Sequence, residues 1–315
     1  MIFIVTHRRG FEADRVIDRL RSLDEPFFRF NTDLFEAEHS YSALIGDRRR
    51  SIRIFCDDRE IDLTSVTAAW LQQPISWPEP LIPFEAARQA SHKTLIDAVL
   101  SQVQCKWMNA PENAFRASNK PLQLLAASEL GLPIPETLIS NHPDDVRKFV
   151  LHKDHVVAKS VGPQWVSDSR GDNAAYTQKV DIAWLESDES IGFAPVTYQA
   201  FHKRRRDIRA VMVGYNAFAA SCTAHEEIQR YDIRKGSENS YQRFELPETV
   251  RVKLKQLMER FDINFCSADF IENNEGTLLF VDLNVTGSWW WVDSIFDGRI
   301  ADAITSQLLQ FKAGQ

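Results

Sequence analysis

The segment 266–291, CSADFIENNEGTLLFVDLNVTGSWWW, restricts the fold more than any other part of this sequence. Two runs of strand-forming residues flank the turn sequence Asn273-Asn274-Glu275-Gly276. Asparagine and glycine favour the tight turns that join antiparallel strands, so the segment is predicted to be a β-hairpin. The hairpin determines which side chains of its two strands can meet.

Three oxygen-bearing side chains of these largely apolar strands are candidate ligands. Asp269 belongs to the first strand, and Asp282 and Asn284 lie two residues apart in the second. Because strand side chains alternate between faces, Asp282 and Asn284 are expected to share a face with Phe280. Folding the hairpin back at its turn would bring Asp269 opposite Phe280 and Val281. The three oxygen-bearing side chains can then cluster on one face.

A hard cation would stabilise such a cluster. Burying two uncompensated carboxylates costs roughly several kcal/mol per ion. Mg²⁺ is commonly held by one or two carboxylates together with substrate phosphates, which suits a set of only three ligands. The alternative is an edge hairpin whose aspartates and asparagine face water. The three residues alone leave both interpretations open.

Charge and cysteine content exclude several classes of function. The chain has 315 residues, a net charge of −7 and a pI near 5.7, so a nucleic-acid partner is not expected. Its four cysteines show no C-x-x-C spacing, which indicates neither a zinc site nor a disulfide framework. The N-terminal apolar run MIFIV is too short for a secretory signal or a membrane span. We therefore expect a cytoplasmic protein that has no membrane partner.

Alternating strand and helix patterns predict an α/β (α+β) chain. Residues 1 to about 115 are expected to form a lobe of their own, because the proline-rich run QQPISWPEPLIP interrupts regular structure before a helix over 84–103. A second helix is predicted after Ser118 or Asn119, either of which can cap it. Its predicted buried stripe comprises Leu122, Leu125, Ala126 and Leu130. Later segments read as successive strands, then a helix over 247–261, the hairpin and a last helix over 295–311.

Four cations stand at predicted ends of strands or helices, namely Lys120, Lys159, Arg209 and Arg234. Each one alone could be a surface charge. Lys159 ends the apolar strand HVVAKS, and small residues follow it, whose backbone N–H groups could approach phosphates. The basic run 203–206 is interpreted as a solvated turn because the whole chain is acidic. Gln199, in the extended sequence YQAF, could present its backbone to a base or could be an ordinary sheet amide.

Other catalytic patterns are missing from the sequence. It contains no H-x-x-x-H spacing and no G-x-S-x-G, so zinc-dependent and serine hydrolases lack support. The cluster Trp289-Trp290-Trp291 could line a substrate groove or pack in the core.

Taken together, these segments resemble the ATP-grasp ligases and, more narrowly, the graspetide (microviridin-type) peptide macrocyclases. The resemblance covers nearly the whole chain. Its carriers are the segments IVTHRRGFEADRVIDRL, FRFNTDLF, NAPENAFRASNKPLQLLAASELGLPIPETLISN, VVAKSV, YQAFHKRRRDIRAVMVG, YDIR and the hairpin. It implies three lobes: an N-terminal pre-ATP-grasp domain over 1–115, a central ATP-grasp subdomain over 116–195 and a C-terminal one over 196–315, with ATP between the last two.

The resemblance also implies roles for individual residues. Lys120, Lys159 and the linker Gln199-Ala200-Phe201 match ATP-binding positions. Arg209 and Arg234 match arginines that face the γ-phosphate and the acyl phosphate. The magnesium ligands would be Asp269, Asp282 and Asn284, and two Mg²⁺ ions are expected.

Two positions depart from the family pattern. Asp282 stands where the family usually has glutamate, which shortens this ligand by one methylene. Gln72-Gln73-Pro74 stands where Arg-Arg-Pro is common, so recognition of the substrate by the N-terminal lobe is expected to differ.

The implied activity is an ATP-dependent carboxylate-amine or carboxylate-hydroxyl ligation. Aspartate or glutamate side chains of a ribosomal precursor peptide would become acyl phosphates, and Thr, Ser or Lys would close ω-ester or ω-amide rings. The expected partner is a precursor peptide with a leader segment, and the enzyme is expected to be a homodimer. Two alternatives are a ligase that joins an amino acid or amine to a small carboxylate, and an inactive nucleotide-binding scaffold.

Overall fold

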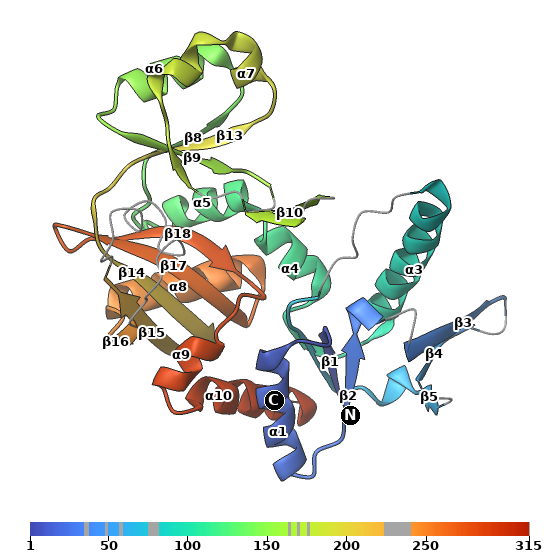
Figure 1. Ribbon diagram of the computed structural model, residues 1–315. Helices are drawn as coiled ribbons and strands as arrows, with labels where there is room; N and C mark the ends of the chain where they lie inside the picture. Colours follow the sequence, from blue (N-terminus) through green and yellow to red (C-terminus); the bar gives the residue numbers. More distant parts are fainter. Residues whose placement is uncertain are drawn as a thin grey trace.

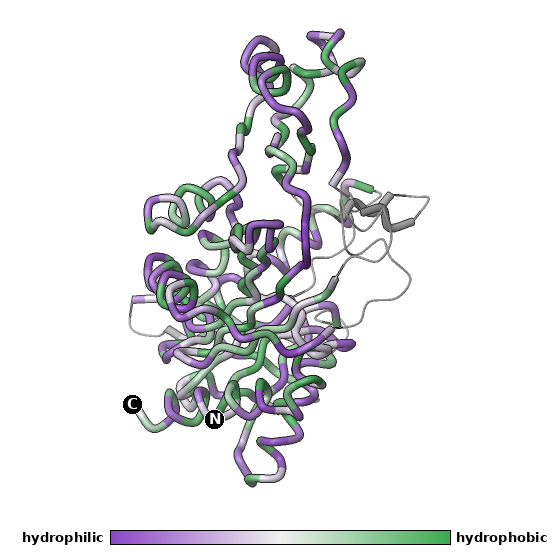
Figure 2. Tube along the Cα trace, turned by 90° about the vertical axis from the view of Figure 1, so that its left-hand side faces the viewer, coloured by the Kyte–Doolittle hydropathy of each residue, from purple (hydrophilic) through white to green (hydrophobic). Residues whose placement is uncertain are grey.

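The computed structural model describes residues 1–34, 38–47, 50–56, 59–74, 82–162, 165–168, 171–174, 177–223 and 241–314. Within these ranges the chain forms a larger body and a smaller lobe that projects from it (Figures 1 and 2). No helix among the described residues is apolar over a length that could cross a bilayer.

The N-terminal part contains a parallel sheet in the order β2-β1-β6-β7. Its strands are β1 (Ile2–Thr6), β2 (Phe27–Asn31), β6 (Ala68–Leu71) and β7 (Lys106–Met108). The strand β1 is apolar from Ile2 to Val5 and completely buried, as expected for a strand covered on both faces. The helices are α1 (Phe11–Ser22) and α3 (Pro83–Gln102), with short 3₁₀ turns at Thr32–Leu34 and Leu63–Ser65.

A three-stranded antiparallel sheet extends from this part beside α3 (Figure 1). It consists of β3 (His39–Ile45), β4 (Arg50–Cys56) and β5 (Arg59–Ile61).

The projecting lobe is an antiparallel sheet in the order β12-β9-β13-β8 with its own apolar core. It comprises β8 (Thr137–Ser140), α6 (Pro143–Leu151), β9 (Val156–Ser160), β12 (Gln178–Lys179), a 3₁₀ turn (Ile182–Glu186), α7 (Asp188–Gly192) and β13 (Val196–Ala200). A separate hairpin pairs β10 (Trp165–Asp168) with β11 (Gly171–Ala174). The boundary predicted between residues 195 and 196 thus lies just before β13, which pairs with β8 and β9 of this sheet.

The C-terminal part is an antiparallel sheet in the order β16-β15-β14-β17-β18. Its strands are β14 (Arg204–Val213), β15 (Asn216–Cys222), β16 (Tyr241–Phe244), β17 (Phe265–Asn273) and β18 (Leu278–Asn284). The helices associated with it are α4 (Pro111–Ala117), α5 (Lys120–Glu129), α8 (Glu248–Phe261), α9 (Trp290–Ile295) and α10 (Arg299–Lys312).

One apolar cluster joins the N-terminal and C-terminal parts into a single body. It combines Ile4 of β1, Val16 of α1, Val211 of β14 and Ile304 of α10, all of which are fully buried. The helix α10 packs against α1, and Arg19 of α1 forms an ion pair with Asp302 of α10. The N-terminal and C-terminal parts therefore form one body, and the projecting lobe extends from it.

Three sequence-based expectations about elements were wrong in detail. The helix α5 is capped by Asn119, but its leucine stripe is misplaced, because Leu122 and Leu125 are 42% and 57% exposed. The buried residues are Gln123, Leu124, Ala126 and Ala127. The basic run is not a turn, since 204–206 belongs to β14. The last predicted helix, 295–311, begins later than expected, at Arg299 of α10, and the short helix α9 that precedes it was not predicted.

Candidate active site

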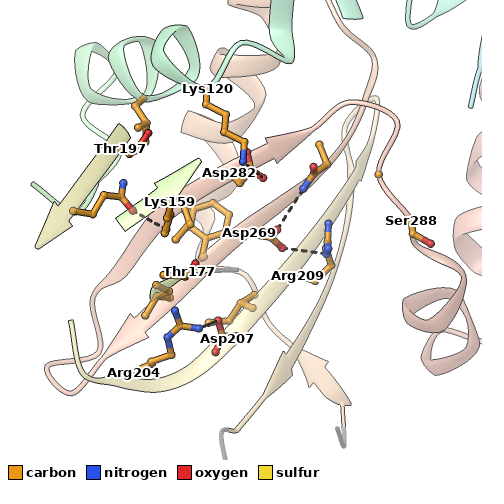
Figure 3. Close-up of a pocket in the computed structure, with 18 of the residues that line it drawn as sticks. Lys120, Lys159, Thr177, Thr197, Arg204, Asp207, Arg209, Asp269, Asp282 and Ser288 are labelled. Atoms are coloured by element: carbon orange, nitrogen blue, oxygen red, sulfur yellow. Dashed lines mark hydrogen bonds and ion pairs between the residues drawn. The ribbon is translucent and has the colours of Figure 1, made fainter. Parts of the chain in front are cut away.

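A cleft of about 540 Å³ lies between the projecting lobe and the C-terminal sheet. Its walls come from α5, β9, β13, β14, β17, β18 and the loop that follows β18 (Figure 3). Predicted site residues that line it are Lys120, Lys159, Gln199, Arg209, Asp269, Asp282 and Asn284. Residues far apart in the sequence are thus brought together around one space.

The hairpin β17–β18 provides the acidic wall of the cleft. Asp269 lies directly opposite Asp282, and a bulge follows, so that Phe270 pairs with Phe280. The predicted pairing of Asp269 with Phe280 and Val281 was therefore wrong. Because the bulge adds one residue, Phe280 turns into the core while Asp282 lines the cleft, and the two do not share a face as expected.

Each carboxylate of the hairpin is matched by a cation. Arg209 Nε lies 3.1 Å from Asp269 Oδ1, and Lys120 Nζ lies 3.9 Å from Asp282 Oδ2. Asn284 Nδ2 donates to Asp269 Oδ2 over 3.4 Å. The Asp282 side chain is only 17% exposed, and that of Asp269 is 35% exposed. The partial burial of both acids is compensated by these neighbouring positive charges.

The opposite wall presents a chain of polar groups from the projecting lobe. Lys159 Nζ donates to Gln199 Oε1 over 2.7 Å, and Gln199 Nε2 donates to Thr137 Oγ1 over 2.9 Å. Gln199 is only 2% exposed, so its side chain is fixed by these two bonds. The other predicted linker residues, Ala200 and Phe201, use their N–H groups to bond Glu136 and His155, respectively.

Arg209 is held by an aromatic ring as well as by Asp269. Its guanidinium carbon lies 5.9 Å from the ring centre of Trp291, and the Tyr241 ring lies 4.1 Å from that of Trp291. Burial, followed by the charge of Cys222, raises the pKa of Tyr241 to about 12. The tryptophan cluster is thus divided, since Trp291 lines the cleft while Trp289 is fully buried.

Several residues that sequence reasoning passed over also line the cleft. Arg204 and Asp207 form an ion pair of 2.8 Å with side chains 9% and 19% exposed. Asp207 lies on the same strand face as Arg209, so strand alternation could have predicted that it lines the cleft. Gln73 reaches the cleft from the N-terminal part. Ser288 lines it from the loop after β18, and its hydroxyl donates to Glu12 of α1. Arg234, the remaining predicted catalytic residue, lies outside the described residues.

The residues of the hairpin fit Mg²⁺ chemically. Two carboxylates and an amide are hard oxygen ligands, and no group of three His, Cys, Asp or Glu residues suited to a metal occurs in the described part of the chain. The amide nitrogen of Asn284 faces Asp269, so ligation through its oxygen requires the opposite amide orientation. Arg209 Nη1 is buried without a hydrogen-bond partner among the described residues. It can therefore donate to a phosphate oxygen.

Comparisons with known proteins bear on the fold and on the N-terminal domain. Residues 1–114 match the MvdD pre-ATP grasp domain. A RiPP-associated ATP-grasp ligase from Chryseobacterium gregarium, solved with ADP and a leader and core peptide, aligns with a TM-score of 0.90 at 21% identity over 98% of this chain and 96% of that one. The macrocyclase MdnC from Microcystis aeruginosa, solved with its precursor peptide MdnA, gives 0.86 at 25% identity over 98% and 99%.

The chain is an ATP-grasp ligase. A curated relative, the tetrahydromethanopterin:alpha-L-glutamate ligase of Methanocaldococcus jannaschii, is 20% identical over 65% of this chain and 70% of its own length. The predicted fold and the resemblance to ATP-grasp macrocyclases are confirmed. ATP and Mg²⁺ are the cofactors expected of this ligase, and solved relatives contain ADP and Mg. The individual residue roles and the domain boundaries stay predictions.

Proposed function

We propose that this ATP-grasp ligase closes rings in a ribosomal precursor peptide, and that it recognises the peptide through a leader segment. One observation carries the proposal. The similarity to the peptide-bound macrocyclase MdnC extends over 98% of the chain, including the N-terminal part, whereas the curated glutamate ligase matches 65%.

The first step transfers the γ-phosphoryl group of ATP to an aspartate or glutamate side chain of the peptide. A carboxylate oxygen bonds to phosphorus, the bond to the bridging oxygen breaks, and ADP leaves. Bound Mg²⁺ would neutralise charge on the phosphates. Arg209 stands beside Asp269, and its Nη1 has no hydrogen-bond partner within the described part of the chain, so it can stabilise charge on the transferring oxygens. We assign Arg234 the same task at the acyl phosphate, from its position in the family motif.

The second step forms the ring. A threonine or serine hydroxyl or a lysine amine of the same peptide attacks the acyl carbon, phosphate leaves, and the nucleophile loses its proton. The peptide thereby loses one water for each ester or amide formed. Lys120 and Lys159, which line the cleft from opposite walls, would hold the nucleotide, and Gln199 fixes Lys159 by a hydrogen bond. We assign the peptide to the side of the cleft that Gln73 lines from the N-terminal part.

The test uses Mg²⁺, ATP and the small peptide encoded beside the gene. Mass spectrometry should show the loss of one water per ring. A gain of one amino-acid residue would instead support the second candidate, an amino-acid ligase, which the curated glutamate ligase favours. Absence of ADP release with every carboxylate tried would support an inactive nucleotide-binding scaffold.

The proposal includes the assembly and location of the enzyme. We assign it a homodimeric state in the cytoplasm, with neither nucleic acid nor membrane as partner. Light scattering at micromolar concentration should give twice the monomer mass of 36.2 kDa. A monomer under these conditions would contradict the dimer without affecting the assignment of the reaction.

A further inference from the structure

The proposed magnesium ligands lie on the edge strand of the C-terminal sheet. The strand β18 is the last in the order β16-β15-β14-β17-β18, so no described strand pairs with its outer side, where the N–H of Phe280 donates to the carbonyl of Pro133 over 2.7 Å. Leu283 lies between Asp282 and Asn284 on this strand. Any shift of its backbone would move both proposed ligands together.

A buried amide from α5 bonds the same edge further along the strand. Gln123 Oε1 accepts from the N–H of Leu283 over 3.0 Å, and Gln123 Nε2 donates to the carbonyl of Leu283 over 2.8 Å. The same Nε2 also donates to the carbonyl of Ala117 over 2.6 Å, which ties it to the end of α4. Gln123 is 2% exposed, and these three bonds satisfy its amide. Its side chain therefore pairs with β18 as a neighbouring strand would.

A second buried amide fixes the other side of Asn284. Asn109, 1% exposed, donates to the carbonyls of Val285 over 2.9 Å and Phe265 over 2.8 Å. Its Oδ1 accepts from the N–H groups of Asn264 and Phe265. The backbone on both sides of Asn284 is thus held by amides from the segment 109–123.

The same helix also supplies the cation that meets Asp282. Lys120 begins α5 three residues before Gln123, and its Nζ lies 3.9 Å from Asp282 Oδ2 (Figure 3). One rigid element therefore fixes the backbone of the acidic wall and places a positive charge against it. The distance between Lys120 and Asp282 depends on how α5 is seated on β18.

We propose that Gln123 is a positioning residue for the metal ligands Asp282 and Asn284, acting through the backbone of Leu283. The proposal rests on the proposed function, in which these two residues bind Mg²⁺. Residues that orient metal ligands from behind commonly change metal affinity by about 10- to 100-fold when they are altered. Gln123 is expected to act in this way although it does not line the cleft.

The test measures ADP binding by calorimetry across a series of MgCl₂ concentrations. Gln123→Met keeps the length of the side chain and removes its hydrogen bonds. The Mg²⁺ concentration that gives half-maximal ADP binding should rise about tenfold or more. The affinity for ADP without Mg²⁺ should stay within about twofold of wild type, because Gln123 does not line the nucleotide cleft.

Leu254→Ala is the matched control. Leu254 is a fully buried residue of α8 and contributes to the same apolar cluster as Leu283, but its aliphatic side chain cannot hydrogen-bond the backbone of β18. Its replacement should lower the melting temperature and leave the Mg²⁺ dependence as in wild type. A purely structural role for Gln123 would produce this control pattern.

The outcomes separate the two proposals. Wild type that binds no ADP at any Mg²⁺ concentration contradicts the proposed function. If ADP binding depends on Mg²⁺ in wild type and shows the same dependence in Gln123→Met, the positioning role of Gln123 is overturned and the proposed function is not. If circular dichroism shows that Gln123→Met is unfolded, Gln123→Glu replaces it, since it keeps the acceptor for Leu283 and removes the donor. An unchanged Mg²⁺ dependence in Gln123→Glu would equally overturn the role.

Discussion

Asp269 and Asp282 face each other across the hairpin β17–β18, and each is neutralised by a cation from a different element. Arg209 of β14 pairs with Asp269, and Lys120 of α5 pairs with Asp282. When a nucleotide and Mg²⁺ bind, Arg209 and Lys120 would contact the phosphates, and Asp269 and Asp282 would contact Mg²⁺. Nucleotide and metal are therefore expected to bind more tightly together than separately.

The Asp282→Asn variant tests the metal assignment. Removing this charge should lower the rate of ADP formation about a hundredfold or more, because a ligand of the phosphate-bound metal is lost. The melting temperature should change little, since the ion pair of Asp282 with Lys120 is long, at 3.9 Å. Asp297→Asn, whose carboxylate is 80% exposed beside Arg243, is the control and should retain full activity. Near wild-type turnover in Asp282→Asn would refute the assignment.

Arg209→Lys tests whether a guanidinium is needed beside the phosphates. Lysine keeps the charge but cannot bond Asp269 and a phosphate oxygen at once in the planar geometry of arginine, nor stack equally on Trp291. We expect kcat to fall about 10²- to 10³-fold, with a smaller change in the KM for ATP. Steady-state ADP release gives both values. Arg251→Lys, at an exposed pair with Glu248, should be silent, and an equally silent Arg209→Lys would remove Arg209 from the mechanism.

Gly287→Ala tests how closely the loop after β18 packs on Asn284, a proposed metal ligand. A Cβ at Gly287 would lie 2.6 Å from the Cβ of Asn284 and 3.0 Å from that of Ser267, so Asn284 must move. We expect a stability loss of about 1–3 kcal/mol in urea unfolding and weaker Mg²⁺-dependent nucleotide binding.

The control for this change is Gly192→Ala, because no atom lies within 4 Å of a Cβ placed there. It should keep wild-type binding and stability or gain slightly, since alanine is the better helix former. If Gly287→Ala behaves like this control, the loop does not constrain Asn284.

Tyr241 predicts a pH dependence of stability. Burial raises its pKa from the ordinary value of 10.0 to about 12. The folded state therefore keeps the phenolic proton where the unfolded state has lost it. The resulting contribution is fully present below pH 10 and is lost as pH rises from 10 to 12.

Tyr241→Phe should remove this component. The difference in unfolding free energy between wild type and variant should decrease across that window and be constant below it. Urea unfolding at several pH values measures the difference. A difference that is independent of pH would show that Tyr241 titrates at its ordinary pKa.

The sequence predicted the hairpin well because its turn residues and its alternating pattern are both local signals. It could not predict the bulge, since nothing about Val281 distinguishes an extra residue from an ordinary strand position. That one residue decides which face Asp282 occupies. The sequence therefore predicted which three residues cluster, namely Asp269, Asp282 and Asn284, but not that Asp269 pairs with Asp282.

Local signals failed for α5 for a related reason. Apolar periodicity selected Leu122 and Leu125, whereas the buried face includes Gln123. A polar residue is buried there because it satisfies the edge of β18, a partner that is 160 residues away in the sequence. Arg204 was misjudged in the same way, because its partner Asp207 becomes evident only when both lie on β14. A contact across 160 residues decided the first case, and the course of β14 decided the second.

The central claim is that the ligase activates peptide carboxylates as acyl phosphates and closes rings with them. The most direct measurement follows ADP and peptide mass in the same reaction with the precursor peptide, Mg²⁺ and ATP. The account predicts one ADP released for every water lost from the peptide, at each stage of the reaction. ADP release with unchanged peptide mass, or with an added amino-acid residue, would contradict it.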